Sequence, residues 1–285
     1  MFVPNDQLLS ETYSYCCVCN MSTQSDFSLR KWYLDCVADN GDTFIGYSAS
    51  VQWKALTLHY SSITTMRGNS GARTKTSLGE SSFPGMKGQR IDWSSKALNL
   101  VGTWTLMAEP TQQHLYDSPE GTVTWSCLHP RSKADILFGK KEHIAGLGYA
   151  ELLELTVKPW QLPIAELRWG RFLSKRDALV WIEWRGDTPL SVVFHNGKQI
   201  RDGSITDEQV SIDGDRTVLT LTERTELRKG VLVSTALSVI PGIALIVPAR
   251  MLRTYECKWR SRGVLNRNGI LCSSGWAIHE VVRFP

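Results

Sequence analysis

Short segments rich in β-branched and aromatic residues recur along the whole chain, with turn residues between them. Clear examples are residues 31–38, 43–53, 178–184 and 190–195. Asn196-Gly197, Asp213-Gly214 and Asn268-Gly269 lie between such segments, and these dipeptides favour tight hairpins. No stretch of a dozen residues keeps apolar positions at the i, i+3, i+4 and i+7 spacing of an amphipathic helix. The sequence therefore predicts an all-β protein.

The number of these segments indicates more than one β-domain. There are about fifteen of them, whereas eight strands already enclose the interior of a small barrel. At 285 residues the chain is long for one core and sufficient for two. We expect two consecutive antiparallel β-barrel domains, residues 1–158 and 159–285, with the boundary where Pro159 and Pro163 bracket an extended crossing. The polar segment from Met66 to Gly88 is expected to be a long loop over the mouth of one domain.

Composition and charge argue against a nucleic-acid partner. Charged residues make up 21% of the chain and hydrophobic residues 42%, as in ordinary soluble proteins, and the net charge is only +4. The run from Arg250 to Arg262 does interleave basic and aromatic residues, as some single-strand binders do. Read at period two, it divides into an apolar face with Tyr255, Cys257 and Trp259, and a polar face with Thr254, Glu256, Lys258 and Arg260. We interpret it as a half-buried strand whose polar face is solvated.

Seven cysteines cannot all pair within one chain. Cys36, Cys127, Cys257 and Cys272 lie in probable strands, where free thiols behave as small hydrophobic groups, and this pattern favours a reducing compartment, the cytoplasm. The remaining three, Cys16, Cys17 and Cys19, form the only grouping that resembles a metal site. No second pair at zinc spacing and no neighbouring histidine accompanies them, so we expect no metal.

One segment has the length of a membrane span. Residues 231–248 are almost entirely apolar, but Pro241-Gly242 falls in the middle and β-branched residues dominate. Two buried strands joined by a Pro-Gly turn explain this pattern better. The first residues also lack the basic flank and apolar core of a secretory signal. We therefore expect no membrane span.

The candidate chemistry centres on a carboxyl in a strand. Tyr149 and Glu151 are two residues apart, so on a strand their side chains point to the same face. Either the carboxyl is solvated, or an apolar pocket raises its pKa so that it can donate a proton. Trp169 and Arg171 likewise share a face. Arg171 could bind a carboxylate or enolate of a substrate, or pair with an acidic residue such as Glu166 or Glu183.

Several motifs resemble a known superfamily. Lys31-Trp32-Tyr33-Leu34-Asp35 resembles the Trp-Trp-Tyr-Phe-Asp signature near the start of the carotenoid hydratase and tocopherol cyclase-like proteins. Further similar segments follow in the order of that superfamily: Thr122–Trp125, Gly148–Glu151, Trp169–Arg171, Leu237–Pro248 and Gly275–Glu280. The resemblance implies two lipocalin-like β-domains, and some members of the superfamily are Diels-Alder cyclases that act on polyketides.

The resemblance also suggests roles for individual residues. In the hydratase branch, a Gly-Tyr-x-Asp strand and a His-x-Trp pair act together on a polyene. Tyr149 and Trp125 match the tyrosine and tryptophan, Glu151 stands for the aspartate, and Val123 occupies the histidine position. The resemblance thus implies that Glu151, Tyr149 and Trp125 are catalytic, with Glu151 as the proton donor. The candidate substrate-binding residues are Trp32, Trp53, Trp169, Arg171 and His279.

These observations together predict a cofactor-independent cyclase, isomerase or hydratase. Its substrate would be a hydrophobic, polyunsaturated small molecule such as a terpenoid, polyene or polyketide, held by shape and protonated in a β-barrel pocket. The alternative is a non-catalytic binder or carrier of an apolar ligand in the same cavity. Whether that cavity lies inside one barrel or between two is left open.

Overall fold

The computed structural model describes residues 26–79, 82–234 and 247–285, and almost all of these residues lie in or between β-strands. The first part of the chain forms one curled antiparallel sheet from ten strands. These are β1 (Phe27–Val37), β2 (Thr43–Trp53), β3 (Leu56–Met66), β4 (Arg73–Leu78), β5 (Gly85–Lys87), β6 (Arg90–Ser95), β7 (Leu100–Leu106), β8 (Thr111–Ser118), β9 (Gly121–Phe138) and β10 (Glu142–Leu155).

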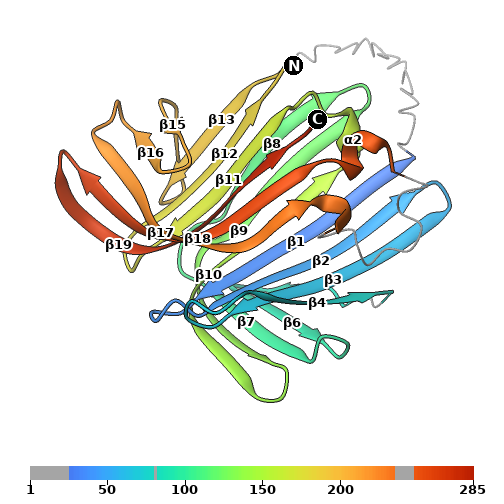
Figure 1. Cartoon of the computed structure of the whole chain (residues 1–285), viewed down its shortest axis with the longest axis horizontal. Helices are drawn as coiled ribbons and strands as arrows, with labels where there is room; N and C mark the ends of the chain where they lie inside the picture. The colour runs from blue at the N-terminus through green and yellow to red at the C-terminus, as the bar shows by residue number, and fades with distance from the viewer. Residues whose placement is uncertain (1–25, 80–81, 235–246) are drawn as a thin grey trace, which may run out of the picture.

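The second part forms another curled antiparallel sheet, from nine strands. These are β11 (Glu166–Leu173), β12 (Ala178–Arg185), β13 (Leu190–His195), β14 (Lys198–Ile200), β15 (Ser204–Ile205), β16 (Gln209–Ile212), β17 (Thr217–Val231), β18 (Tyr255–Arg267) and β19 (Ile270–Arg283). Three single-turn helices complete the described elements: η1 (Pro159–Gln161), η2 (Leu232–Ser234) and α2 (Ala249–Leu252). Figure 1 shows the first sheet in blue to green and the second in yellow to red.

The prediction of an all-β fold is confirmed, and the two curled sheets match two lipocalin-like β-barrel domains. In each sheet the first and the last strand lie side by side in the middle, because β1 pairs with β10 and β11 pairs with β19. The sheets are separated along the chain by the segment between Leu155 and Glu166, which contains η1. The exact limits 1–158 and 159–285 stay a prediction.

The expectation of a long loop from Met66 to Gly88 is wrong for much of that segment. β4 extends the first sheet beyond β3, and β5 pairs with β6 at the other end of the sheet. Thr64 and Thr74 on β3 and β4 share a hydrogen bond of 2.9 Å between their hydroxyls. These strands are polar because they lie at sheet edges, where side chains meet water on both faces.

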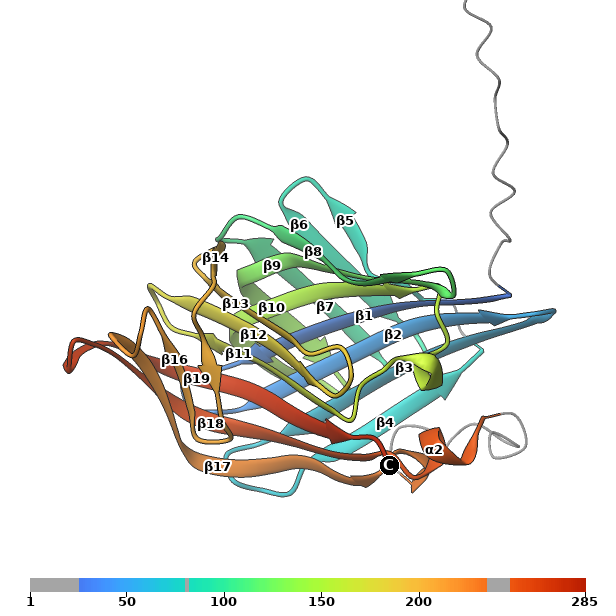
Figure 2. The ribbon, with the colours of Figure 1, turned by 90° about the horizontal axis from the view of Figure 1, so that it is seen from above.

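Strand β1 explains why the two sheets pack together. Its residues alternate between two cores: Trp32, Leu34 and Cys36 face the interior of the first sheet, whereas Tyr33 and Val37 contribute to a core between the sheets. Residues 32–37 are buried on both faces and are apolar except for Asp35, which lies on the same face as Tyr33 and Val37. A third core fills the interior of the second sheet, around Phe172, Trp181 and Leu219. Figure 2 shows the second sheet lying against the first.

Strand β18 corrects one expectation. The residues Thr254, Glu256, Lys258 and Arg260 were expected to form a solvated face, and all of them are buried. Their face of β18 is the one that carries Trp276 and Glu280 on the neighbouring strand β19, and it is directed towards the first sheet. A polar face is therefore enclosed between two sheets, which local periodicity alone does not reveal.

Two expectations concern residues that lie wholly or mostly outside the described ranges. Cys16, Cys17 and Cys19 lie outside the described residues, as does most of the apolar segment 231–248. Among the described residues, no helix is long and apolar enough to cross a bilayer. The four cysteines within the described ranges, Cys36, Cys127, Cys257 and Cys272, are free thiols.

Candidate functional site

The Glu151 carboxyl lies between the two sheets. Glu151 is on β10, opposite Tyr33 of β1 and Cys127 of β9, so it occupies the centre of the first sheet. Tyr149 and Glu151 are two residues apart on the strand, so both side chains point to the same face, towards the second sheet. Only 7% of Glu151 is exposed, and Tyr149 is completely buried.

One oxygen of this carboxyl accepts three hydrogen bonds. Glu151 Oε2 accepts from the indole Nε1 of Trp125 at 2.6 Å, from the phenol of Tyr149 at 2.7 Å and from the indole Nε1 of Trp169 at 3.1 Å. Trp125 and Tyr149 belong to the first sheet, whereas Trp169 lies on β11 of the second. The carboxyl therefore joins the two domains.

The protonation of Glu151 reflects a balance of opposing effects. Burial disfavours the anion and raises the pKa of Glu151 above its ordinary value of 4.5, although the bonds from Trp125, Tyr149 and Trp169 and the charge of Lys31 act in the other direction. Within the described residues, Oε1 has no hydrogen-bond donor. The proton of the neutral acid therefore belongs on Oε1, on the side of the carboxyl away from the three donors.

Aromatic rings surround this carboxyl. The ring centroids of Tyr33 and Trp169 lie 4.9 Å apart, and those of Tyr149 and Trp169 lie 5.8 Å apart, in edge-to-face geometry. Trp125 lies 5.6 Å from Phe194 of β13, again across the boundary between the sheets. These contacts fix the donors around Glu151 and leave only 7% of Glu151 exposed.

A buried lysine lies next to this aromatic cluster. The Lys258 ammonium is 2.6 Å from a carboxylate oxygen of Glu280, and it lies 4.9 Å from the ring centroid of Tyr33, 5.0 Å from that of Trp169 and 5.6 Å from that of Tyr47. Burial alone would lower the pKa of Lys258, but the charge of Glu280, the Tyr47 phenol and the hydrogen bond to Glu280 together outweigh burial and raise it. Lys258 is thus a permanent cation held by a carboxylate and three π-faces. Sequence reasoning did not assign it a role, since a strand pattern does not show which sheet lies opposite.

The Arg171 side chain is engaged in a buried ion pair. Its Nε and Nη2 donate to the two carboxylate oxygens of Asp35 at 2.9 and 2.8 Å, and its Nη1 donates to the carbonyl of Trp276 at 2.8 Å. Tyr33 donates to the same carboxylate at 2.9 Å. The side chains of Asp35 and Arg171 are both completely buried. The acidic partner of Arg171 is therefore Asp35, and not Glu166 or Glu183 as the sequence suggested.

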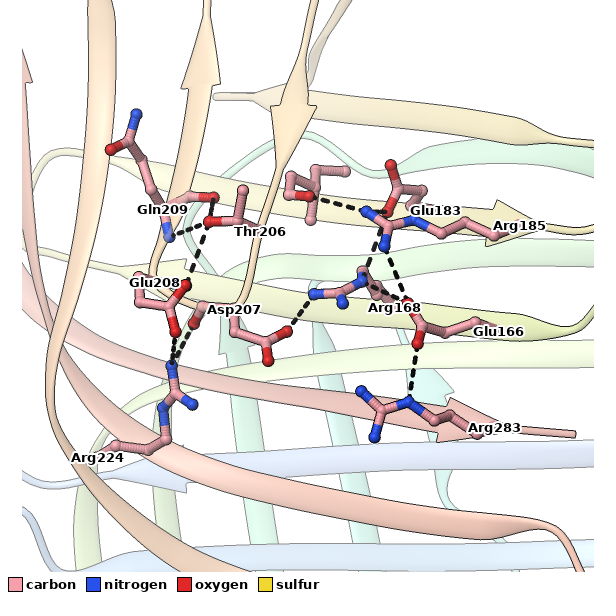
Figure 3. Close-up of polar contacts among 11 residues, drawn as sticks. Glu166, Arg168, Glu183, Arg185, Thr206, Asp207, Glu208, Gln209, Arg224 and Arg283 are labelled. Carbon is pink, nitrogen blue, oxygen red and sulfur yellow. Dashed lines mark hydrogen bonds and ion pairs between the residues drawn. The ribbon is translucent and has the colours of Figure 1, made fainter.

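Glu166 and Glu183 instead belong to an ionic network on the opposite face of the second sheet. Arg168 contacts both glutamates and also Asp207, and Arg283 donates to Glu166 at 2.9 Å. Figure 3 shows this network together with the turn that contains Asp207. Arg168 and Arg171 are three residues apart on β11, so they point to opposite faces, and each finds acidic partners on its own side.

The remaining candidate residues lie apart from Glu151. Trp32 packs in the interior of the first sheet, and the ring of Trp53 lies 5.3 Å from that of Trp160. His279 points away from Glu280, and its Nε2 shares a hydrogen bond of 2.9 Å with the Ser261 hydroxyl. Burial lowers the pKa of His279 to about 3, so it is neutral near pH 7. The structure thus brings together Glu151, Tyr149, Trp125 and Trp169, with Arg171 nearby through Tyr33, whereas Trp32, Trp53 and His279 lie elsewhere.

The described residues offer no site for a metal ion. No group of three or more His, Cys, Asp or Glu side chains in the described ranges is arranged to hold one. The chemical groups that the Glu151 site does contain are a buried acid, its three hydrogen-bond donors and a neighbouring ammonium.

The fold and this site define a two-domain lipocalin-like protein with an acid enclosed between its domains. Crystal structures with the same fold include a candidate AttH from Nitrosomonas europaea, with a TM-score of 0.55 and 11% identity over 90% of this chain and 92% of that chain. CghA crystallised with Sch210972 gives a TM-score of 0.56 at 11% identity, over 90% of this chain and 89% of that chain.

A named hydratase is also similar. Kievitone hydratase from Nectria haematococca gives a TM-score of 0.53 at 10% identity, over 90% of this chain and 88% of that chain. No protein-family model and no curated protein sequence matches this chain. The resemblance to the carotenoid hydratase and tocopherol cyclase-like superfamily is confirmed for the fold, which is what a likeness at this level of identity establishes.

Proposed function

We propose that this protein is a cofactor-independent cyclase, isomerase or hydratase of a hydrophobic, polyunsaturated small molecule, and that Glu151 is its proton donor. One observation carries the proposal: a buried carboxyl with a raised pKa whose Oε2 is held by three donors, so that the proton of the neutral acid is on Oε1. A polar group this deeply buried, in a superfamily fold that includes Diels-Alder cyclases and hydratases, is better explained by chemistry than by stability alone.

The proposed step is transfer of the Oε1 proton to an unsaturated carbon or a carbonyl oxygen of the substrate. A bond from hydrogen to the substrate forms as the O–H bond of Glu151 breaks, which leaves a carboxylate on the protein. Trp125, Tyr149 and Trp169 already donate to that carboxylate, so the anion forms in a preorganised site. The proton returns from the substrate when a neighbouring C–H bond breaks in an isomerisation or cyclisation, or from water in a hydration.

The two indoles around Glu151 are suited to different roles. The face of Trp169 already has the Lys258 ammonium 5.0 Å from its centroid, so a second positive charge there would be repelled. Trp125 has no such cation among its described contacts and packs against Phe194. Trp125 is therefore the ring that would shape the substrate or stabilise positive charge on it, and Tyr149 is the residue that orients the acid.

A non-catalytic carrier is the second candidate. Val123 stands where the hydratase branch has a histidine, so one member of the expected catalytic set is replaced by an apolar residue. A carrier would use the same buried surfaces without proton transfer. It would keep its ligand unchanged, and this difference can be measured.

Two variants test the proposal. We would purify the chain and its Glu151→Gln variant from the native host, identify bound molecules by native mass spectrometry and organic extraction, and follow conversion of any unsaturated precursor found. Glutamine keeps an oxygen acceptor for the three donors but cannot supply an acidic proton. Glu154→Gln is the matched control, since Glu154 is on the same strand with its side chain 47% exposed.

The proposal expects a loss of turnover of at least about a hundredfold in Glu151→Gln, with ligand binding retained and Glu154→Gln unaffected. Unchanged turnover in Glu151→Gln would remove the acid from the mechanism. A ligand that is bound but never altered by the wild-type chain would support the carrier.

A further inference from the structure

A cavity of about 510 Å³ lies between the two sheets, away from the Glu151 carboxyl. Val37 and Leu147 of the first sheet and Leu173, Arg262 and Trp276 of the second contribute to its lining, so both domains are needed to form it. Glu151 is not among the lining residues. A volume of this size is within the range of small-molecule sites.

The charge of this cavity is unbalanced. Arg171, Lys175, Arg176 and Arg262 line it, against the single carboxylate of Asp39. Arg171 is neutralised by Asp35. In the described part of the chain, no carboxylate lies within ion-pair distance of Lys175, Arg176 or Arg262, which leaves three cations facing one anion.

The arginines are held in place by neutral partners. Arg176 Nη2 donates to the backbone carbonyl of Cys272 at 2.7 Å, which orients the guanidinium without cancelling its charge. The guanidinium carbon of Arg262 lies 4.2 Å from the ring centroid of Trp276. A planar guanidinium stacked on an indole keeps its N–H donors in the plane free for an oxyanion. Both groups are therefore preorganised and still charged.

The cavity also has an apolar part, beside the hydroxyls of Ser174, Ser273 and Ser274. Val37, Leu147, Leu173 and Leu271 border the cavity along with the Trp276 indole. The Trp276 Nε1 is buried and has no hydrogen-bond partner among the described residues, and a buried donor without an acceptor is costly.

We propose that this cavity is a binding site for a small organic carboxylate with an apolar chain or ring. The carboxylate is bound by Arg262, Arg176 and Lys175, and the hydrocarbon part lies against the leucines and Trp276. The sequence suggested that Arg171 could bind a substrate carboxylate. Its Nε, Nη1 and Nη2 instead donate to Asp35 and to the Trp276 carbonyl, so we assign carboxylate binding to the neighbouring Arg262, Arg176 and Lys175. The inference goes beyond the proposed chemistry and does not depend on turnover at Glu151.

Calorimetric titration of the full chain with decanoate, and with the uncharged decanamide, tests the site. We expect decanoate to bind with one-to-one stoichiometry and decanamide at least about tenfold more weakly, because a hydrogen bond to a charged group contributes most when both partners carry charge. Decanoate affinity is expected to fall as the salt concentration rises.

Three variants define the outcome. Arg262→Gln and Lys175→Gln are each expected to weaken decanoate binding about tenfold, whereas Arg267→Gln, an exposed arginine farther along the same strand β18, leaves it unchanged. Lys175 is exposed in the turn after β11, so weaker decanoate binding by Lys175→Gln cannot be attributed to misfolding. Equal affinity for decanoate and decanamide, or equal losses in all three variants, would overturn the inference. Glu151→Gln is expected to bind decanoate normally, so failure of the proposed function and failure of this site are distinguishable.

Discussion

The buried pair of Asp35 and Arg171 makes a quantitative prediction about how the two domains depend on each other. Asp35 belongs to β1 and Arg171 to β11, so their two charged hydrogen bonds cross from one sheet to the other. Replacing Arg171 with methionine would leave the Asp35 carboxylate completely buried with Tyr33 as its remaining described partner. Removal of one member of a buried pair typically costs about 3–5 kcal/mol.

The double variant separates the charge from the packing. In Asp35→Leu/Arg171→Met no charge is left without a partner, and apolar replacements of buried pairs are often close to neutral. Tyr33 would still lose its acceptor, at a cost of about 1–3 kcal/mol. We therefore expect the double variant to be more stable than Arg171→Met alone.

Urea unfolding followed by tryptophan fluorescence measures these differences. Arg30→Met is the control, because Arg30 and Glu154 form an ion pair at 3.5 Å with both side chains about half exposed, and such pairs contribute at most about 1 kcal/mol. Asp35→Leu alone completes the cycle. If Arg171→Met cost less than about 1 kcal/mol, or if the losses in Asp35→Leu and Arg171→Met added up to the loss in the double variant, the buried pair would not couple the domains as described.

Three further predictions follow from burial and packing. The folded chain binds the Glu151 proton more tightly than the unfolded chain, so protonated Glu151 stabilises the fold fully below the ordinary pKa of 4.5. This stabilisation is lost as the pH rises through the raised folded pKa, and Glu151→Gln should reduce the pH dependence of the free energy of unfolding in that window. For His279 the pH dependence of stability has the opposite sign, because its folded pKa of about 3 lies below the ordinary 6.5. Neutral His279 stabilises the fold fully above pH 6.5, and this stabilisation is lost as the pH falls towards 3. His279→Asn should weaken that loss of stability in acid, measured by the same urea unfolding. Gly170→Ala would place a methyl group 2.2 Å from the Trp181 ring, and we expect a loss of about 1–3 kcal/mol by thermal unfolding; no loss would mean that the indole moves aside easily.

Local patterns predicted the centre of the candidate site because it depends on one strand. The period of two places Tyr149 and Glu151 on one face, and this needs no knowledge of the rest of the fold. The resemblance to the superfamily added Trp125, and the donor bonds to Glu151 show the three side chains together. Their catalytic roles stay a prediction.

The features that the sequence did not predict depend on which strands and sheets lie next to each other in the fold. The polar face of β18 was expected to be solvated, because a polar face usually is, and Lys258 is instead enclosed beside Glu280. Asp35 as the partner of Arg171 is separated from it by most of the first domain, so neither strand contains a signal for the pairing. The segment from Met66 to Gly88 was assigned to a loop because edge strands such as β4 can be as polar as loops.

The side-by-side placement of the first and last strands has a consequence for synthesis. β1 emerges from the ribosome early, yet one of its two neighbours, β10, is the last strand of its sheet to be made, and β11 has the same relation to β19. Until the closing strand arrives, β1 and β11 each have an unpaired backbone edge, which can pair with a foreign chain. Contacts between residues so distant in the chain also form slowly. Newly made copies of this protein should therefore depend on chaperones for as long as each sheet stays open.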